Sequence, residues 1–208
     1  MIINHNNKVP KIDASAYVAP NAVVCGDVII GANVRIMFGA QIIAESSPIK
    51  IGDHCIILEN AVIRGTNGFP VTIGNNCLVG PHAHLAGCTV ENNVFIATGA
   101  SVFHGAVLKT GSEVRINGVV HLKTVLPENE AVPIGWIAVG NPAKILPPGR
   151  DEEIWPIQKP LNFPLTVYGV DRPANDEPNN MPAICREMGK RLSSHCNDSL
   201  QDSQIRRK

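Results

Sequence analysis

An aliphatic residue recurs at every sixth position through most of this chain, and this repeat constrains the fold more than any other feature. The period runs from Ile12 to Ile42 without a break and continues, with two interruptions and one shortened step, as far as Val132. Six residues match neither the helical period of about 3.6 nor the simple alternation of a strand. Three such hexapeptides make one triangular coil of a parallel β-helix, in which successive coils stack.

A second, smaller residue follows each repeat position by four places, as Ala16, Ala22 and Ala40 do. Gly, Asn or Asp often lies between the two positions, and these residues turn a backbone at low cost. Each hexapeptide is therefore predicted to be a short strand followed by a corner. Aromatic residues make up only 4% of the chain, which fits the narrow, aliphatic core of such a coil.

The repeat is broken at residues 44–50 and 66–72, where Pro and Gly occur, and we expect a short loop at a corner in both places. The coils should end near Pro147 and Pro148, because proline gives no donor to a further parallel strand. We therefore expect a β-helix domain at residues 1–148 and a C-terminal extension at 149–208.

The extension is expected to hold short helices. One opens at Asp151 with three acidic residues and is limited by Pro156. A second, over residues 182–196, carries Ile184, Met188 and Leu192 on one face and should pack on the solenoid or on a neighbour. The polar residues 197–208 are expected to be disordered.

Composition limits the partners and the compartment. The formal net charge is zero, so nothing suggests nucleic acid as a partner. The sequence has no signal-peptide pattern and no apolar stretch of membrane-spanning length. Six separated cysteines without a CxxC pair suggest reduced thiols, and we expect a cytoplasmic protein without membrane contact.

The repeat, the loop before Ile51, the segment from Val79 to Cys88 and the closing run from Gly140 to Lys144 together resemble the γ-class carbonic anhydrase branch of the hexapeptide-repeat superfamily. The resemblance covers about residues 8–158. It implies an all-β, left-handed β-helix, an exception to the right-handed crossover rule, and a homotrimer with metal sites between subunits.

In that family three histidines hold a zinc ion, and the corresponding positions here look like Arg64, Pro81 and Ala86. None of these side chains can serve as a neutral nitrogen ligand. The usual zinc triad is therefore absent, and whether any metal binds stays open. If one does, the available ligands are His82, His84 and Glu59.

His82 and His84 lie in the segment that in this family normally supplies two of the zinc ligands. Their position suggests a remodelled cleft between subunits. One chain is expected to supply Arg64, His84, Phe103 and His121, and its neighbour Glu59, His82 and Thr98. We assign acid-base or other catalytic roles to His84, His82, Arg64 and Glu59, and substrate binding to Arg64, Phe103, Thr98 and His121. Arg64 could alternatively form an ion pair with Glu45 or Glu59 across the interface. His54 and His104 are expected to be surface residues.

Three functions from different classes follow. The first is a lyase, hydratase or hydrolase that acts on a small polar or carboxylated substrate or anion, rather than an ordinary carbonic anhydrase. The second is a non-catalytic trimer that binds or scaffolds a partner. The third is a coenzyme A-dependent acyltransferase, suggested by the Gly140–Lys144 run that many hexapeptide-repeat proteins carry.

Overall fold

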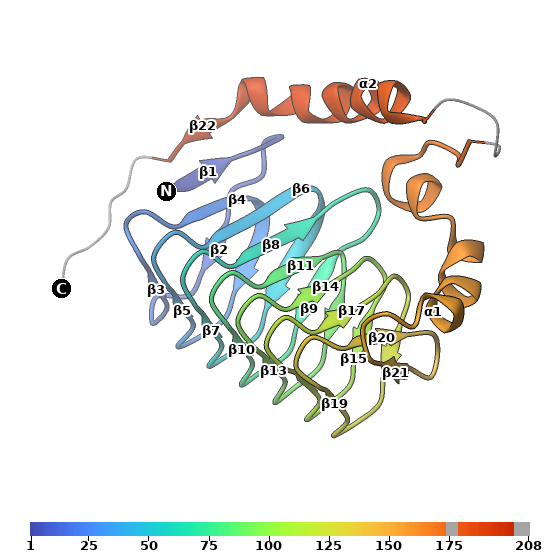
Figure 1. The fold of residues 1–208 in the computed structure, drawn as a ribbon. Helices are drawn as coiled ribbons and strands as arrows, with labels where there is room; N and C mark the ends of the chain where they lie inside the picture. Colours follow the sequence, from blue (N-terminus) through green and yellow to red (C-terminus); the bar gives the residue numbers. More distant parts are fainter. Residues whose placement is uncertain (174–178, 202–208) are drawn as a thin grey trace.

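The computed structural model describes residues 1–173 and 179–201, and most of the chain winds into a left-handed parallel β-helix (Figure 1). Equivalent residues of successive coils pair in parallel register, as Leu78 does with Ile56 on one side and Phe95 on the other. The fold predicted from the six-residue repeat is confirmed.

The strands form three faces. Face one consists of β3 (Tyr17–Val18), β5 (Arg35–Ile36), β7 (Ile56–Ile57), β10 (Leu78–Val79), β13 (Phe95–Ile96), β16 (Glu113–Val114) and β19 (Ala131–Val132). Face two contains β1 (Ile2–Asn4), β8 (Val62–Gly65), β11 (His84–Ala86), β14 (Ser101–Val102), β17 (Val119–Val120) and β20 (Ile137–Val139). Face three contains β2 (Lys11–Ile12), β9 (Val71–Ile73), β12 (Thr89–Val90), β15 (Val107–Leu108) and β18 (Val125–Leu126).

Two long strands, β4 (Val23–Ile30) and β6 (Gln41–Ile51), extend from face two into face three and join these faces into one sheet. The loop expected at residues 44–50 is therefore wrong. Burial alternates along this segment, with Ser47, Ile49 and Ile51 buried, as in a strand with one covered face. The second interruption is a short loop, closed by a bridge between Thr66 and Phe69.

The core is a set of aliphatic columns along the solenoid axis. On face two, Ile42, Ile63, Leu85, Val102 and Val120 are stacked in register, and all five are fully buried. Each coil covers the apolar side of the next, so burial of this column stabilises the stack as a whole.

The last coil ends in an antiparallel pair of β20 with β21 (Lys144–Leu146), followed by α1 (Asp151–Gln158). Pro156 does not end α1, which continues for two more residues before η1 (Lys159–Leu161). The chain then forms the one-turn π-helix η2 (Pro164–Tyr168).

The remaining C-terminal segment returns along the solenoid toward its first coil (Figure 1). It consists of α2 (Met181–Leu192), η3 (Ser193–Asn197) and β22 (Ser199–Leu200). The amphipathic helix is confirmed, but the disorder expected from residue 197 is wrong up to residue 201, because β22 pairs antiparallel with β1. Residues 202–208 lie outside the described residues. Within the described residues, no helix combines the length and the apolar character needed to cross a membrane.

Candidate functional site

The C-terminal extension covers one corner of the solenoid and encloses a cavity of about 130 Å³, which we call the lid cavity. The solenoid side of its lining is Glu45, Arg64, Thr66, His84, Ala86, Phe103 and His104. The extension supplies Phe163, Val167, Tyr168, Met188 and Arg191. One wall of the cavity is therefore built by the repeat and the other by residues that follow it.

Hydrogen bonds hold the extension in place over the cavity. Arg191 of α2 donates to the carbonyl oxygens of Val167 and Tyr168, at 3.1 and 2.8 Å. From the solenoid side, Asn67 Nδ2 donates to the carbonyls of Thr166 and Val167, at 3.2 and 2.9 Å. The loop after β8 and helix α2 thus both fix η2.

An ion pair between Arg64 and Glu45 lies in the lid cavity. The two residues occupy neighbouring coils, because Arg64 on β8 pairs in register with Ile43 on β6. Glu45 is 4% exposed. The ion pair that the sequence suggested across an interface therefore forms within one chain. The Arg64 Nε atom is buried and has no hydrogen-bond partner among the described residues.

Two histidines of the lid cavity are held in their neutral form. Burial lowers the pKa of His84, and the nearby Arg64 guanidinium lowers it further. Burial lowers the pKa of His104 to about 4, with smaller contributions from His84 and Arg64. Both imidazoles are therefore uncharged at neutral pH and able to accept a proton.

His104 is buried, at 6% exposed, so the expectation of a surface residue is wrong. The Phe69 ring contacts it edge-on, with the ring centroids 5.4 Å apart, and this ring comes from the loop that interrupts the repeat. The regular coil pattern places His104 at a corner but gives no sign of the covering loop. His104 Nδ1 has no hydrogen-bond partner among the described residues. His54 is exposed.

An aromatic cluster stands beside the lid cavity. Phe103 is stacked on His121, with centroids 5.5 Å apart, and Phe163 of the extension meets both rings edge-on. The main-chain N–H of Leu122 donates to His121 Nδ1 at 2.7 Å, which places the proton of a neutral His121 ring on Nε2. Burial lowers the pKa of His121.

The predicted site residues fall into two groups within one chain. Arg64, His84 and Phe103 line the lid cavity, and His121 is stacked against Phe103. Glu59, His82 and Thr98 lie at another corner. There the main-chain N–H of His82 donates to the main-chain carbonyl of Glu59 at 3.0 Å. The sequence-based hypothesis assigned this second group to a neighbouring subunit.

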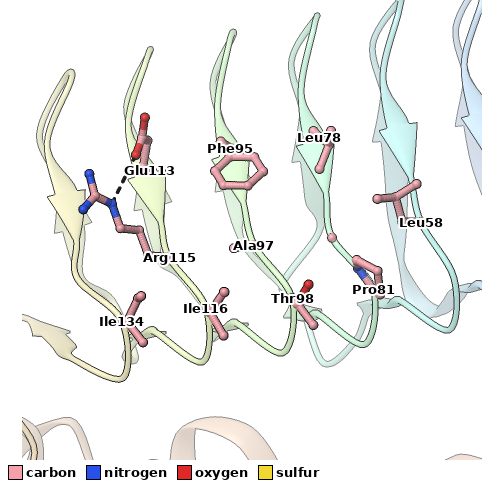
Figure 2. Close-up of a pocket in the computed structure, with 11 residues that line it drawn as sticks. Leu58, Leu78, Pro81, Phe95, Ala97, Thr98, Glu113, Arg115, Ile116 and Ile134 are labelled. Atoms are coloured by element: carbon pink, nitrogen blue, oxygen red, sulfur yellow. Dashed lines mark ion pairs between the residues drawn. The ribbon is translucent and has the colours of Figure 1, made fainter.

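That corner adjoins a larger, apolar hollow of about 470 Å³ along face one, which we call the face-one groove. Figure 2 shows its lining, which includes Leu58, Leu78, Pro81, Phe95, Ala97, Thr98, Ile116 and Ile134. Phe95 and Ile134 are 41% and 64% exposed. Glu113 and Arg115 form an ion pair of 3.5 Å at one side of the groove.

The residues at the positions of the family's zinc ligands do not fit a zinc ion. The Arg64 guanidinium has N–H groups but no lone pair for a metal, and it is paired with Glu45. The side chains of Pro81 and Ala86 have no atom that could bind a metal. Within one chain, the described part of the structure does not bring His82, His84 and Glu59 together as a metal cluster either. No step of the chemistry is therefore assigned to zinc at this place.

Known proteins that are similar to this chain include γ-class carbonic anhydrases and hexapeptide transferases. Residues 70–104 match the family model of the bacterial transferase hexapeptide (six repeats). The mitochondrial protein gamma carbonic anhydrase 1 of Arabidopsis thaliana is 33% identical over 159 residues, which are 74% of this chain and 56% of the plant protein. A carbonic anhydrase of Geobacillus kaustophilus is 26% identical over 154 residues, covering 74% of this chain and 81% of the relative.

A solved structure has a similar fold over almost the whole chain. The crystal structure of a hexapeptide transferase family protein from Anaplasma phagocytophilum matches with a TM-score of 0.52 at 25% identity, over 91% of this chain and 97% of that one. The chain spans about half the length of these plant relatives, 56% of gamma carbonic anhydrase 1 and 55% of gamma carbonic anhydrase 2. The repeat, the coil register and these similarities support a γ-carbonic-anhydrase-like hexapeptide-repeat protein.

Proposed function

We propose that the lid cavity binds a small carboxylate or similar anion, and that the protein is a lyase, hydratase or hydrolase acting on it. The observation that carries this proposal is a pair of buried polar atoms, Arg64 Nε and His104 Nδ1, that have no hydrogen-bond partner among the described residues. Both belong to residues that line this one cavity. Leaving such an atom unpaired costs about 1–3 kcal/mol, so native proteins seldom do so without a ligand or ordered water.

A carboxylate matches this site in chemistry and in size. Its oxygens accept hydrogen bonds from a guanidinium N–H and from an imidazole N–H at the same time. A volume of about 130 Å³ corresponds to the liquid volume of about four water molecules. The cavity therefore supports a ligand of a few heavy atoms.

The neutral histidines supply the proton transfer that lyase, hydratase and hydrolase reactions require. In this assignment Arg64 orients the anionic end of the substrate, and His84 takes a proton from the substrate or from water. Phe103 supplies an apolar part of the cavity wall, and His121 is stacked against it. Glu45 positions the Arg64 guanidinium and is not itself placed in the proton transfer.

We also propose that the protein is a homotrimer in which a second copy packs against the face-one groove. The support is the apolar lining and the exposure of Phe95, Ile116 and Ile134. An exposed apolar strip of this kind marks an interaction surface in soluble proteins. The roles predicted for Glu59, His82 and Thr98 depend on this assembly, which would carry them to a neighbour's cavity.

We place the protein in the cytoplasm. Cys25, Cys55, Cys77 and Cys88 are buried and free, and Cys185 and Cys196 are exposed and free. Thiols that persist unpaired fit a reducing compartment.

Binding is tested first by calorimetry of the full chain with formate, acetate and malonate. Arg64→Lys is the decisive variant, because lysine keeps the positive charge beside Glu45 but removes the Nε donor. We expect Arg64→Lys to weaken binding at least about tenfold, whereas Arg115→Lys in the face-one groove leaves it unchanged. If none of the anions binds, or if both variants bind like the parent, the proposal fails.

Catalysis is tested separately by proton NMR in D₂O with small unsaturated and 2-hydroxy carboxylates and their esters. Turnover that is lost in His84→Ala supports the enzyme. Binding without turnover of any of these compounds favours the non-catalytic trimer. A heat signal with acetyl-coenzyme A that survives Arg64→Lys would favour the acyltransferase.

A further inference from the structure

A second cluster of ligand-type side chains lies at the first coil, away from the aromatic part of the lid cavity. It consists of His5, Cys25, His195 and Asp198, which each offer one ligand atom, and these atoms lie within 4.8 Å of one another. His5 and Cys25 belong to the N-terminal part of the chain and are buried, while His195 and Asp198 come from its C-terminal end. We call this group the terminal cluster.

The ligand atoms of the terminal cluster are close enough together to approach a tetrahedral metal site. Bonds of about 2.0–2.3 Å in a tetrahedron put neighbouring ligand atoms about 3.3–3.8 Å apart. Here Asp198 Oδ2 is 3.9 Å from Cys25 Sγ and 2.8 Å from His195 Nδ1. Asp198 Oδ1 is 2.5 Å from His5 Nδ1. One separation is slightly longer than a tetrahedral edge and two are shorter by about 0.5–0.8 Å, so binding would require the Asp198 carboxylate to move slightly away from the two imidazoles.

The two ring nitrogens of His5 have different partners, a main-chain carbonyl at Nε2 and the Asp198 carboxylate at Nδ1. His5 Nε2 lies 2.9 Å from the Glu45 carbonyl, which can only accept, so Nε2 is the donor. The Asn6 amide also lies 2.9 Å from Nε2, and this tautomer requires that amide to present its oxygen. With Nε2 as the donor, Nδ1 is the nitrogen that can bind an ion together with Asp198.

A backbone carbonyl that fixes the far nitrogen of a histidine is the usual second shell of a metal site. The two imidazole rings are also stacked, with centroids 4.3 Å apart and an interplanar angle of 26°. The Nδ1 atom of each ring lies next to one oxygen of the Asp198 carboxylate. Thiolate, imidazole and carboxylate together are the donor set that zinc prefers, whereas calcium and magnesium take oxygen ligands.

We propose that His5, Cys25, His195 and Asp198 bind a zinc-type ion that fastens the C-terminal segment to the first coil. The ion would lie between η3 and the start of β22 on one side and β1 and β4 on the other. It joins parts of the chain that are 173 residues apart at Cys25 and Asp198. Since this site is separate from the positions of the family's zinc ligands, it does not depend on the function proposed above.

An ion at the terminal cluster would also affect the structure of the lid cavity. Helix α2, which ends at η3, carries Met188 and Arg191 into the cavity lining. On the other side, the carbonyl that accepts from His5 belongs to Glu45, the ion-pair partner of Arg64. A metal at the terminal cluster would thus help to hold α2 in its position over the lid cavity.

The test uses the full chain, expressed without a polyhistidine tag, stripped with a chelator and titrated with Co²⁺ and then Zn²⁺. We expect about one ion per chain. Cobalt should show the thiolate-to-metal charge-transfer band and the intense visible bands of a tetrahedral site, and zinc should abolish both. Cys25→Ala should lose the thiolate band, and His195→Ala and Asp198→Asn should weaken affinity at least about a hundredfold.

Two matched controls locate the ion. Cys196→Ser removes a neighbouring exposed thiol, and His84→Ala removes an imidazole of the lid cavity; both should bind like the parent. His195 is partly exposed, so His195→Ala is expected to fold, with circular dichroism as the check. An ion that survives His195→Ala and Cys25→Ala, or that is lost only in His84→Ala, overturns the proposal. Binding of less than about a tenth of an ion per chain also overturns it, because the cluster would then be only a hydrogen-bonded histidine–carboxylate group.

Discussion

The two hollows of this protein are made from the same repeat and differ in what covers them. The lid cavity is small, contains an ion pair and neutral histidines, and is closed by the chain's own C-terminal extension. The face-one groove is larger, apolar and open. In a solenoid every face presents a similar ladder of side chains, so the added segments and loops decide which corner becomes a polar pocket.

The two hollows also differ in how far their ion pairs are exposed to water. Arg64–Glu45 is largely withdrawn from water, whereas Arg115–Glu113 has both side chains about half exposed. A buried pair is costly to break, because the partner left behind is an uncompensated charge, while an exposed pair contributes little. The same chemistry is therefore expected to have different consequences in the two hollows.

The largest expected effect comes from breaking the covered pair. Glu45→Ala should lower the free energy of unfolding by about 3 kcal/mol, reduced from the fully buried case because Arg64 retains some access to water. Glu113→Ala should change it by less than about 1 kcal/mol. Urea unfolding of both variants measures the contrast, and equal effects would show that the lid cavity is not protected from solvent.

The next effect is a pH dependence that only the covered hollow should show. Because the folded-state pKa of His104 is about 4, below the usual value of about 6.5, the folded protein favours the neutral ring. This stability is complete above the unfolded pKa and is lost as the pH falls toward the folded pKa. Between about pH 7 and pH 5 the protein should lose about 2 kcal/mol through this residue.

His104→Gln should remove that part of the pH dependence, and His54→Gln, at an exposed corner, should leave it in place. Thermal or urea unfolding at several pH values tests both variants. A parent protein whose stability is the same at these pH values would contradict the burial of a neutral His104.

A smaller effect is expected from loosening the cover. Arg191→Ala removes two hydrogen bonds to the η2 carbonyls, and should cost about 1–2 kcal/mol. Limited proteolysis should then cut the extension faster, and anion affinity should fall by about tenfold. Arg186→Ala, on an exposed position of the same helix, is the control. Unchanged proteolysis would mean that α2 does not hold the lid closed.

The smallest effect on the protomer itself should come from the open groove. Ile134→Glu is expected to change the free energy of unfolding of a protomer by less than about 0.5 kcal/mol, yet to convert the trimer into smaller species in light scattering. Ile29→Glu, an exposed aliphatic position on face three, should leave the assembly intact. A parent protein that is already monomeric would remove the proposed role of the groove.

The sequence predicts the solenoid well because each coil repeats the same pattern of aliphatic and turn residues. The aliphatic positions and the Asn and Gly corners specify strand and turn several times over, so the register of Val90, Leu108 and Leu126, which are each 18 residues apart, follows from spacing alone. The exceptions are places where a local pattern was ambiguous. Ser46 to Pro48 reads as a loop by composition but alternates in burial as part of β6.

The site was only half predictable, for a physical reason. Arg64, His84 and Phe103 share the cavity because their coil register brings them together, and register can be counted along the chain. Phe163, Tyr168 and Arg191 enter the cavity through tertiary packing of the extension, which no repeat specifies. The amphipathic pattern of α2 indicated a covered face but not the corner that it covers.

The most direct test is a crystal structure of the full chain grown with malonate. We expect electron density in the lid cavity with a carboxylate oxygen within hydrogen-bond distance of Arg64 Nε and His104 Nδ1, while the Arg64–Glu45 pair stays formed. A cavity filled by a rearranged side chain, with malonate bound only elsewhere on the surface, would contradict it.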